Sequence, residues 1–276
     1  MVLGLGLPAA FVYAKESLSD KIQNIGDLKG ATLAPILGEI AHNETLQPVA
    51  ITKQDRSPTA EMLRLIRTNL QFALPEPGSK VLLITSGRSN EGKTFFCLNL
   101  AASLVLAGKK VVVVNMDLRK PDSLLEQGLR PGYGLADYLL ADSMPASDII
   151  HTSPVVPGLR VVSAGPLLPD PAEAILSTKL DQLLELLRQE FDYVLFDSAP
   201  VGQVADAFSL VPYVDATLYV VRYNYTEKAQ LAMVNTLLAD NRLGPLLLLA
   251  NDAYKRNLPN YGYGYGYQNT PKKKVV

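Results

Sequence analysis

Residues 81–108 read VLLITSGRSNEGKTFFCLNLAASLVLAG, and this stretch decides the fold of the chain. It begins with an apolar strand and ends in an apolar stretch with helical periodicity. Between the two lies a turn with Gly87, four further residues, and then Gly92, Lys93 and Thr94. That spacing, between a strand and a helix, is the phosphate-binding loop (P-loop) pattern.

Each part of this loop has a predicted task. The glycines let backbone N–H groups turn toward phosphate oxygens, and the helix N-terminus adds its positive dipole. Lys93 is expected to reach the β- and γ-phosphates, and the Thr94 hydroxyl to bind Mg²⁺. The predicted nucleotide site comprises Gly87, Arg88, Ser89, Asn90, Glu91, Gly92, Lys93, Thr94 and Phe95, together with Asn251 at the end of a later strand.

Further strands are predicted along the chain, separated by helical segments. They lie at residues 110–117, 159–165, 192–197, 216–223 and 245–251. Such alternation predicts an α/β fold, a P-loop NTPase whose mostly parallel, twisted sheet has helices on both faces.

Two of these strands end in aspartate, where ligands bind in open parallel sheets. The strand at 110–117 ends in Asn115-Met116-Asp117, followed by Arg119. Asp117 is a candidate for holding Mg²⁺ or for accepting a proton from an attacking hydroxyl, the alternative being a loop cap. The strand at 192–197 ends in Asp197, the Walker B pattern, whose carboxylate is expected to orient Mg²⁺.

Composition limits the function classes. The net charge of the 276 residues is −1, so there is no electrostatic case for binding nucleic acid. Cys97 is the one cysteine, expected to be a small core residue. His42 and His151 are far apart in sequence, and no Cys/His spacing typical of a metal site occurs.

The ends of the chain differ from the predicted 57–253 domain. Residues 1–14 are apolar and too short to span a bilayer. We interpret them as the truncated end of a transmembrane helix, the alternative being a buried or disordered leader, and residues 15–56 as a juxtamembrane segment and linker. Residues 24–41 are expected to hold a short helix and a strand.

A helix is predicted from Ser57 and Pro58, a favourable N-cap and first helical residue. It carries Glu61, Arg64 and Arg67 at i, i+3 and i+6, which we expect on one face. A solvated charged face is the simpler interpretation of these three residues.

Residues 254–276 form a tyrosine-rich tail that we expect to be flexible, because its glycines make ordering costly. Its tyrosines suit an enzyme that phosphorylates hydroxyl groups, whereas an adhesive low-complexity tail is the alternative. The candidate phosphoacceptors are Tyr254, Tyr261, Tyr263, Tyr265 and Tyr267.

The ordered set of motifs resembles the cytoplasmic domain of the bacterial tyrosine kinases (BY-kinases) of capsule and exopolysaccharide export. It comprises SPTAEMLRLIRTNLQF, SGRSNEGKT, VVVVNMDLRKP, AGPLLPDPAEAILS, YVLFDSAP and the tyrosine cluster, over roughly residues 50–267. The front segment, residues 1–41, resembles the end of a transmembrane helix and the cytoplasmic extension of the associated transporter protein.

The resemblance implies an ATP- and Mg²⁺-dependent, non-specific protein-tyrosine kinase. Lys93, Asp117 and Arg119 would be catalytic, with Asp117 as base, and Thr94, Asp117 and Asp197 would hold the metal. Glu61, Arg64 and Arg67 match the family's E-x-x-R-x-x-R subunit-contact motif, so that the tail of one subunit enters its neighbour's active site in a ring.

The resemblance also implies where such a protein acts. It would work at the cytoplasmic face of the bacterial inner membrane, with polysaccharide polymerisation and export machinery and a cognate tyrosine phosphatase as partners.

Two alternative functions remain open. Asn115 stands where the family commonly has a first aspartate, so a nucleotide-gated scaffold with weak or no kinase activity is one alternative. A MinD/ParA-type ATPase switch is the other, although Arg88 replaces the extra lysine usual there and those proteins lack a tyrosine string.

Overall fold

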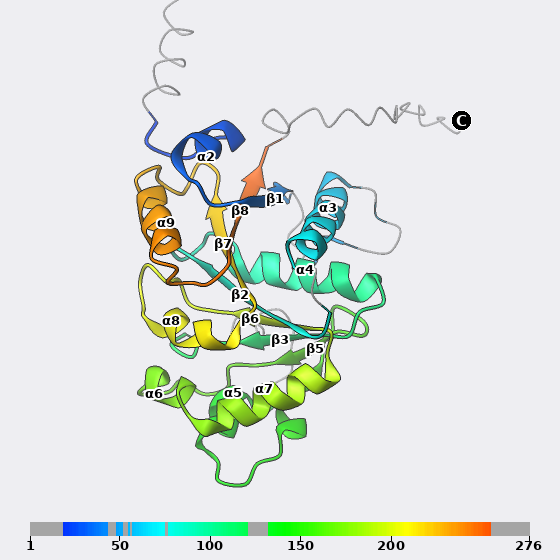
Figure 1. The fold of residues 1–276 in the computed structure, drawn as a ribbon. Helices are drawn as coiled ribbons and strands as arrows, with labels where there is room; N and C mark the ends of the chain where they lie inside the picture. The colour runs from blue at the N-terminus through cyan, green and yellow to red at the C-terminus, as the bar shows by residue number, and fades with distance from the viewer. Residues whose placement is uncertain are drawn as a thin grey trace, which may run out of the picture.

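The computed structural model describes residues 19–43, 48–51, 55, 57–74, 77–120 and 132–254. Within these residues eight strands form one sheet in the order β1-β8-β7-β2-β6-β3-β5-β4 (Figure 1). Neighbouring strands are parallel except for the β4–β5 pair. The bounds are β1 Ile36–Ala41, β2 Lys80–Ser86, β3 Val111–Asn115, β4 His151–Thr152, β5 Arg160–Val162, β6 Tyr193–Asp197, β7 Ala216–Arg222 and β8 Leu246–Ala253.

The strands are apolar on both sides because helices cover both faces of the sheet. Side chains of β2 alternate between two cores: Leu82 and Ile84 lie in one, and Val81 and Leu83 lie in the other. Helices α3 (Pro58–Ala73) and α4 (Lys93–Leu106) cover the first face. The second face is covered by α2 Ile25–Ala31, α5 Leu135–Leu140, α6 Pro171–Ile175, α7 Thr178–Glu190, α8 Asp206–Leu210 and α9 Gln230–Ala239. Two short 3-10 helices, Ala146–Ile149 and Val211–Tyr213, complete the described elements. This architecture confirms the predicted α/β class.

Strand β1 extends the sheet beyond the predicted domain start at residue 57. It pairs in parallel with β8, and α3 packs over it (Figure 1). Gly38 permits this approach, because a Cβ there would lie 2.6 Å from Ile66 Cγ1. The helix and strand expected within residues 24–41 are therefore present, and they belong to the same sheet as the P-loop.

The sheet order brings the predicted site residues to one edge. Strand β2 leads into the P-loop, β6 lies beside it, and β3 lies beside β6. In register, Asp197 is paired with Ile84 on one side and with Asn115 on the other. Asp197 and the loop after β3 therefore lie next to the P-loop at the carboxyl ends of the strands.

Candidate nucleotide-binding site

The P-loop turns between β2 and α4 through a left-handed glycine. Gly92 has φ 95°, a conformation that residues with a Cβ rarely adopt. A Cβ at this position would also lie 2.0 Å from Asn251 Nδ2. That amide donates a hydrogen bond to the Glu91 carbonyl (3.0 Å). Asn251, predicted to bind nucleotide, thus braces the loop backbone from the end of β8.

Glu91 is fully buried and supports the loop from within. Its Oε2 accepts a hydrogen bond from the Arg88 backbone N–H (2.7 Å), and its Oε1 accepts one from the Thr226 hydroxyl. The Glu91 side chain therefore holds the shape of the loop, and its predicted place in the nucleotide site stays a prediction.

The end of β7 and the segment after it fix the loop carbonyls from outside. Arg222 donates to the Asn90 carbonyl (3.0 Å), and the Tyr225 hydroxyl donates to the Ser89 carbonyl (3.1 Å). Because its carbonyls are held in this way, the loop is pre-shaped before any anion binds. Neither donor could be predicted from the sequence, since both lie more than a hundred residues after the loop.

Lys93 begins α4, and its ammonium lies in the buried interior of the loop. Its Nζ donates to Ser86 Oγ (3.1 Å). Burial lowers the pKa of this amine and outweighs the opposing pull of nearby carboxylates (Asp197, Glu91, Asp117). A desolvated cation in a nest of N–H groups is well suited to binding phosphate oxygens.

Oxygen ligands meet beside Lys93. Thr94 Oγ1 donates to Asp197 Oδ2 (2.6 Å), and Asp197 is 3% exposed. Asp117 Oδ1 is buried without a hydrogen-bond partner among the described residues. A hydroxyl and two carboxylates are the hard oxygen donors that Mg²⁺ prefers, so these residues fit the predicted metal.

No group of three or more His, Cys, Asp or Glu side chains able to hold a metal occurs in the part of the chain that the structure describes. A cation at this corner would thus complete its shell with water and substrate oxygens, as Mg²⁺ usually does.

Arg119 is held by a partner that was not predicted from the sequence. Its Nε and one terminal nitrogen donate to the two carboxylate oxygens of Asp206, at 2.5 and 2.8 Å. This bidentate bond raises the pKa of Arg119. Asp206 begins α8, and an acidic residue in the first turn of a helix after the β6 strand is the weak signal that could have identified it.

Lys120 links the loop after β3 to the P-loop. Its Nζ donates to Ser89 Oγ (3.0 Å), and that hydroxyl donates to Gln203 Oε1 (2.9 Å). The three segments that carry Ser89, Lys120 and Gln203 are thereby joined over the site. None of these contacts was predicted from the sequence.

Two side chains of the predicted nucleotide site point elsewhere. The Arg88 guanidinium pairs with Glu227 (3.0 Å) and lies 6.0 Å from the Tyr225 ring centroid. Phe95 is partly buried and packs against the core that α3 and α4 cover. At these positions the backbone, and not the side chain, is therefore available to a ligand.

The cysteine and the two histidines lie outside the site, and each contacts other residues of the fold. Cys97 is buried, as expected, and burial raises the pKa of its thiol. His42 bonds Asp252 and stacks on the Tyr254 ring, with centroids 4.7 Å apart. His151 bonds the Tyr133 carbonyl (2.8 Å). The candidate phosphoacceptors Tyr261, Tyr263, Tyr265 and Tyr267 lie outside the described residues.

The three residues of the predicted subunit-contact motif do not share one environment. Arg64 donates to Glu61 (2.5 Å) on the outer side of α3. Arg67 instead turns inward and donates to the Ser103 carbonyl (2.7 Å) of α4. Glu61 is exposed, whereas Arg64 is half-buried and also donates to the Asp55 carbonyl (2.5 Å). Arg67 holds two helices of the same chain together.

Comparison with known proteins agrees with this geometry. Residues 82–257 match the CobQ/CobB/MinD/ParA nucleotide binding domain. Tyrosine-protein kinase YwqD of Bacillus subtilis is 34% identical over 223 residues, which cover 79% of this chain and 90% of YwqD. The chain belongs to the bacterial tyrosine kinases.

A solved structure and a longer relative extend the BY-kinase comparison. The chimerical protein CapA2B2 is 29% identical with a TM-score of 0.73, over 83% of this chain and 99% of that one. The putative tyrosine-protein kinase EpsB of Ralstonia solanacearum is 29% identical over 256 residues, 93% of this chain. The chain spans 32% of the length of EpsB.

Proposed function

We propose that this chain is an ATP-dependent protein-tyrosine autokinase that phosphorylates its own C-terminal tyrosine cluster in trans, within a ring-shaped oligomer. The observation that carries the proposal is the corner formed by the buried Lys93 and Asp197 and the half-buried Thr94 and Asp117 in a BY-kinase fold. Five tyrosines from residue 254 onward supply candidate acceptors.

In phosphoryl transfer the protein mainly positions the reactants and stabilises the charge of the transition state. Lys93 and the loop N–H groups would hold the β- and γ-phosphates. Thr94, Asp197 and Asp117 would hold Mg²⁺, which supplies charge neutralisation at the phosphates when bound. No part of this assignment needs the Arg88 side chain.

The attacking tyrosine hydroxyl has a pKa of about 10, so it needs a proton acceptor or a late proton transfer. Asp117 is the candidate, because its Oδ1 is buried and has no hydrogen-bond partner in the described residues. Arg119 would act as a positioning residue, since its bidentate bond to Asp206 ties the end of β3 to α8.

We further propose that the protein regulates capsule or exopolysaccharide polymerisation and export at the cytoplasmic face of the inner membrane, and that a cognate tyrosine phosphatase reverses its phosphorylation. The resemblance of the sequence motifs to the BY-kinases of capsule and exopolysaccharide export, together with the apolar residues 1–14, supports this placement. Those fourteen residues lie outside the described part of the chain. Within the described part, the helices are too short or too polar to cross a bilayer.

The assignment is tested by Lys93→Met in the full chain. We expect this variant to lose tail phosphorylation, because the phosphates lose their buried cation, while its melting temperature stays at or above that of the wild type. The measurement is ³²P transfer from ATP at matched protein concentration, with Lys29→Gln as the surface control. Labelling retained in Lys93→Met would contradict the proposal.

A second candidate function is a nucleotide-gated scaffold, which Asn115 favours because it removes one carboxylate from the metal corner. This alternative predicts nucleotide-dependent assembly without any tyrosine labelling. Equilibrium binding of ATP, measured alongside labelling, separates the two functions.

A further inference from the structure

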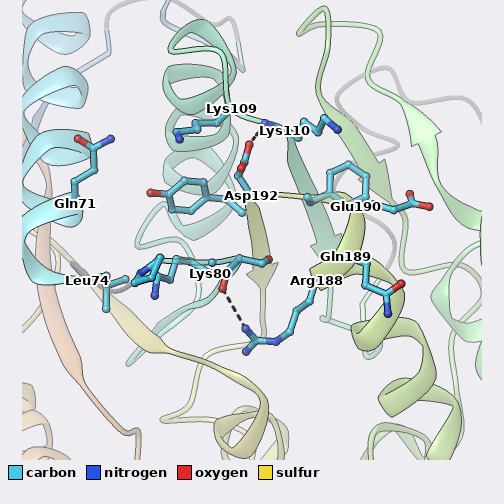
Figure 2. A pocket seen from close by; sticks show the side chains of 14 residues that line it. Gln71, Leu74, Lys80, Lys109, Lys110, Arg188, Gln189, Glu190 and Asp192 are labelled. Atoms are coloured by element: carbon cyan, nitrogen blue, oxygen red, sulfur yellow. Dashed lines mark hydrogen bonds between the residues drawn. The ribbon is translucent and has the colours of Figure 1, made fainter.

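A second polar pocket lies at the opposite ends of the strands from the P-loop. It has a volume of about 520 Å³ and opens where β2, β3 and β6 begin (Figure 2). Its lining includes four cations and two carboxylates: Lys80, Lys109, Lys110, Arg188, Glu190 and Asp192. The nucleotide site at the carboxyl ends of the strands makes no use of these residues.

The pocket carries cations that have no anionic partner. Lys80 is only 9% exposed, yet in the described residues it forms no ion pair. Lys109 and Lys110 are exposed and also form no ion pair within the described residues, and Figure 2 shows them on the other side of Asp192 from Lys80. Three lysines without a counter-charge make this end of the sheet locally positive, so the pocket would attract an anionic group.

The remaining polar groups support the same conclusion. Asp192 Oδ2 accepts the Lys110 backbone N–H (2.8 Å), and Arg188 is satisfied by the Ser79 carbonyl (3.2 Å) and by Asp215. Ser79 Oγ is buried without a hydrogen-bond partner within the described ranges, so it is free to donate to a ligand oxygen.

The pocket also has apolar walls. Beside the lysines it is lined by Phe191, Tyr193, Leu74 and Pro77. Cations combined with aromatic and aliphatic surface suit a ligand in which a phosphate is attached to a ring. We propose that the pocket binds phosphotyrosine of the C-terminal cluster of this same chain.

The tail is long enough for its phosphotyrosines to reach the pocket. Tyr265 and Tyr267 follow Tyr254 by eleven and thirteen residues, which span at most about 36 to 45 Å when extended. Along the strand direction the pocket lies about 23 Å from the end of β8, the length of seven residues, and across the sheet β6 lies three strands from β8, about 14 Å.

An adjoining pocket offers room for a second phosphotyrosine. It has a volume of about 610 Å³ and shares Lys109, Lys110 and Phe191 with the first. Tyrosines two residues apart in an extended tail are separated by about 7 Å, so neighbouring phosphates could occupy both pockets.

This inference rests on the proposed tail phosphorylation. A phosphorylated tail held at the far end of its own subunit is withdrawn from the neighbour's active site. The pocket would therefore promote product release and favour the separation of subunits that like-charge repulsion between phosphorylated tails begins.

The test uses the full chain after phosphatase treatment and without ATP, so that it does not depend on kinase activity. Fluorescein-labelled peptides of residues 258–270, with phosphotyrosine or tyrosine at 265 and 267, are titrated by fluorescence anisotropy. We expect the phosphopeptide to bind at least tenfold more tightly. Lys109→Gln combined with Lys110→Gln should weaken it about tenfold, because charge-assisted contacts are lost.

Matched controls locate the binding. Lys29→Gln, a surface charge on α2, and saturating Mg²⁺-ADP should leave the phosphopeptide affinity unchanged, and Lys110→Arg should retain it. Equal binding of both peptides, an unaffected double variant, or displacement by Mg²⁺-ADP would each overturn the proposal. Loss of labelling in kinase assays with intact phosphopeptide binding would contradict only the proposed function.

Discussion

Asn115 stands at the end of β3, where the resemblance to BY-kinases leads one to expect an aspartate. Its Oδ1 accepts the Asp117 backbone N–H (3.0 Å), and it is paired in register with Asp197. An asparagine therefore holds the turn that positions Asp117 without adding a third carboxylate to the corner. An aspartate could accept the same bond, but it would bring a negative charge beside Asp197.

The substitution Asn115→Asp tests the charge balance of this corner. Without metal, the added like charge should lower the melting temperature by about 2 to 4 °C, the change expected for roughly 1 kcal/mol in a domain of this size. With Mg²⁺ the variant should gain more stability than the wild type. Differential scanning fluorimetry with and without Mg²⁺ measures both, and an identical metal response would contradict the assignment.

Site residues that are close in sequence could be predicted, and those that meet through the fold could not. Lys93 and Thr94 belong to one local motif, so their positions in sequence already predict that they lie together in the P-loop. The partner of Arg119 is Asp206, 87 residues away, and only the pairing of β3 with β6 and the position of α8 bring them together. Similarly, Arg88 was expected at the nucleotide, but Glu227 competes for its guanidinium.

At the scale of elements, β1 and α3 form a unit that extends the domain toward the N-terminus. Asn69 on α3 donates to the Leu37 carbonyl (2.8 Å). Glu39 of β1 is 5% exposed and accepts a hydrogen bond from the Tyr223 hydroxyl. Burial raises the pKa of this carboxyl, and the bond from Tyr223 offsets that only in part.

The sign of this shift gives a pH prediction. A raised pKa means that the fold favours protonated Glu39, so its stabilisation is present below the ordinary pKa of 4.5 and is lost as pH rises through the folded value. Glu39→Gln mimics the protonated form and should raise the melting temperature at pH 7, with the difference shrinking toward pH 4. A variant that melts lower than the wild type at pH 7 would show instead that the fold favours the Glu39 carboxylate.

The sequence predicted which strands form better than it predicted which strands lie side by side in the sheet. The six strands expected between residues 81 and 251 are all present, because continuous β-branched and aliphatic runs are typical of buried parallel strands. The joining of β1 to the sheet was not predicted, since the polar, irregular residues 42–57 separate it from the predicted domain. Nor was β4, whose two residues are too few to produce a pattern.

At the scale of the whole molecule, the proposed ring depends on the outer side of α3. Arg64→Ala removes the pair with Glu61 and the bond to the Asp55 carbonyl, so it should lower the oligomer mass with a smaller loss of stability than Arg67→Ala. Arg67→Ala removes a bond between α3 and α4 and should destabilise the monomer itself, by roughly 1 to 3 kcal/mol. Mass photometry and thermal melting of both variants separate the two roles.

The assignment of Arg64 to a subunit contact would be wrong if Arg64→Ala left the oligomer mass unchanged. The matched variant Thr68→Ala, also on the exposed side of α3, controls for general effects on the helix.

The proposed function is the transfer of phosphate from ATP to the tyrosines of the chain's own tail. Intact mass spectrometry of the purified full chain, before and after Mg²⁺-ATP and after tyrosine phosphatase, tests it most directly. We expect steps of about 80 Da per phosphate that the phosphatase removes and that peptide sequencing assigns to residues 254–267. An unchanged mass in protein that still binds ATP would contradict it and favour the scaffold.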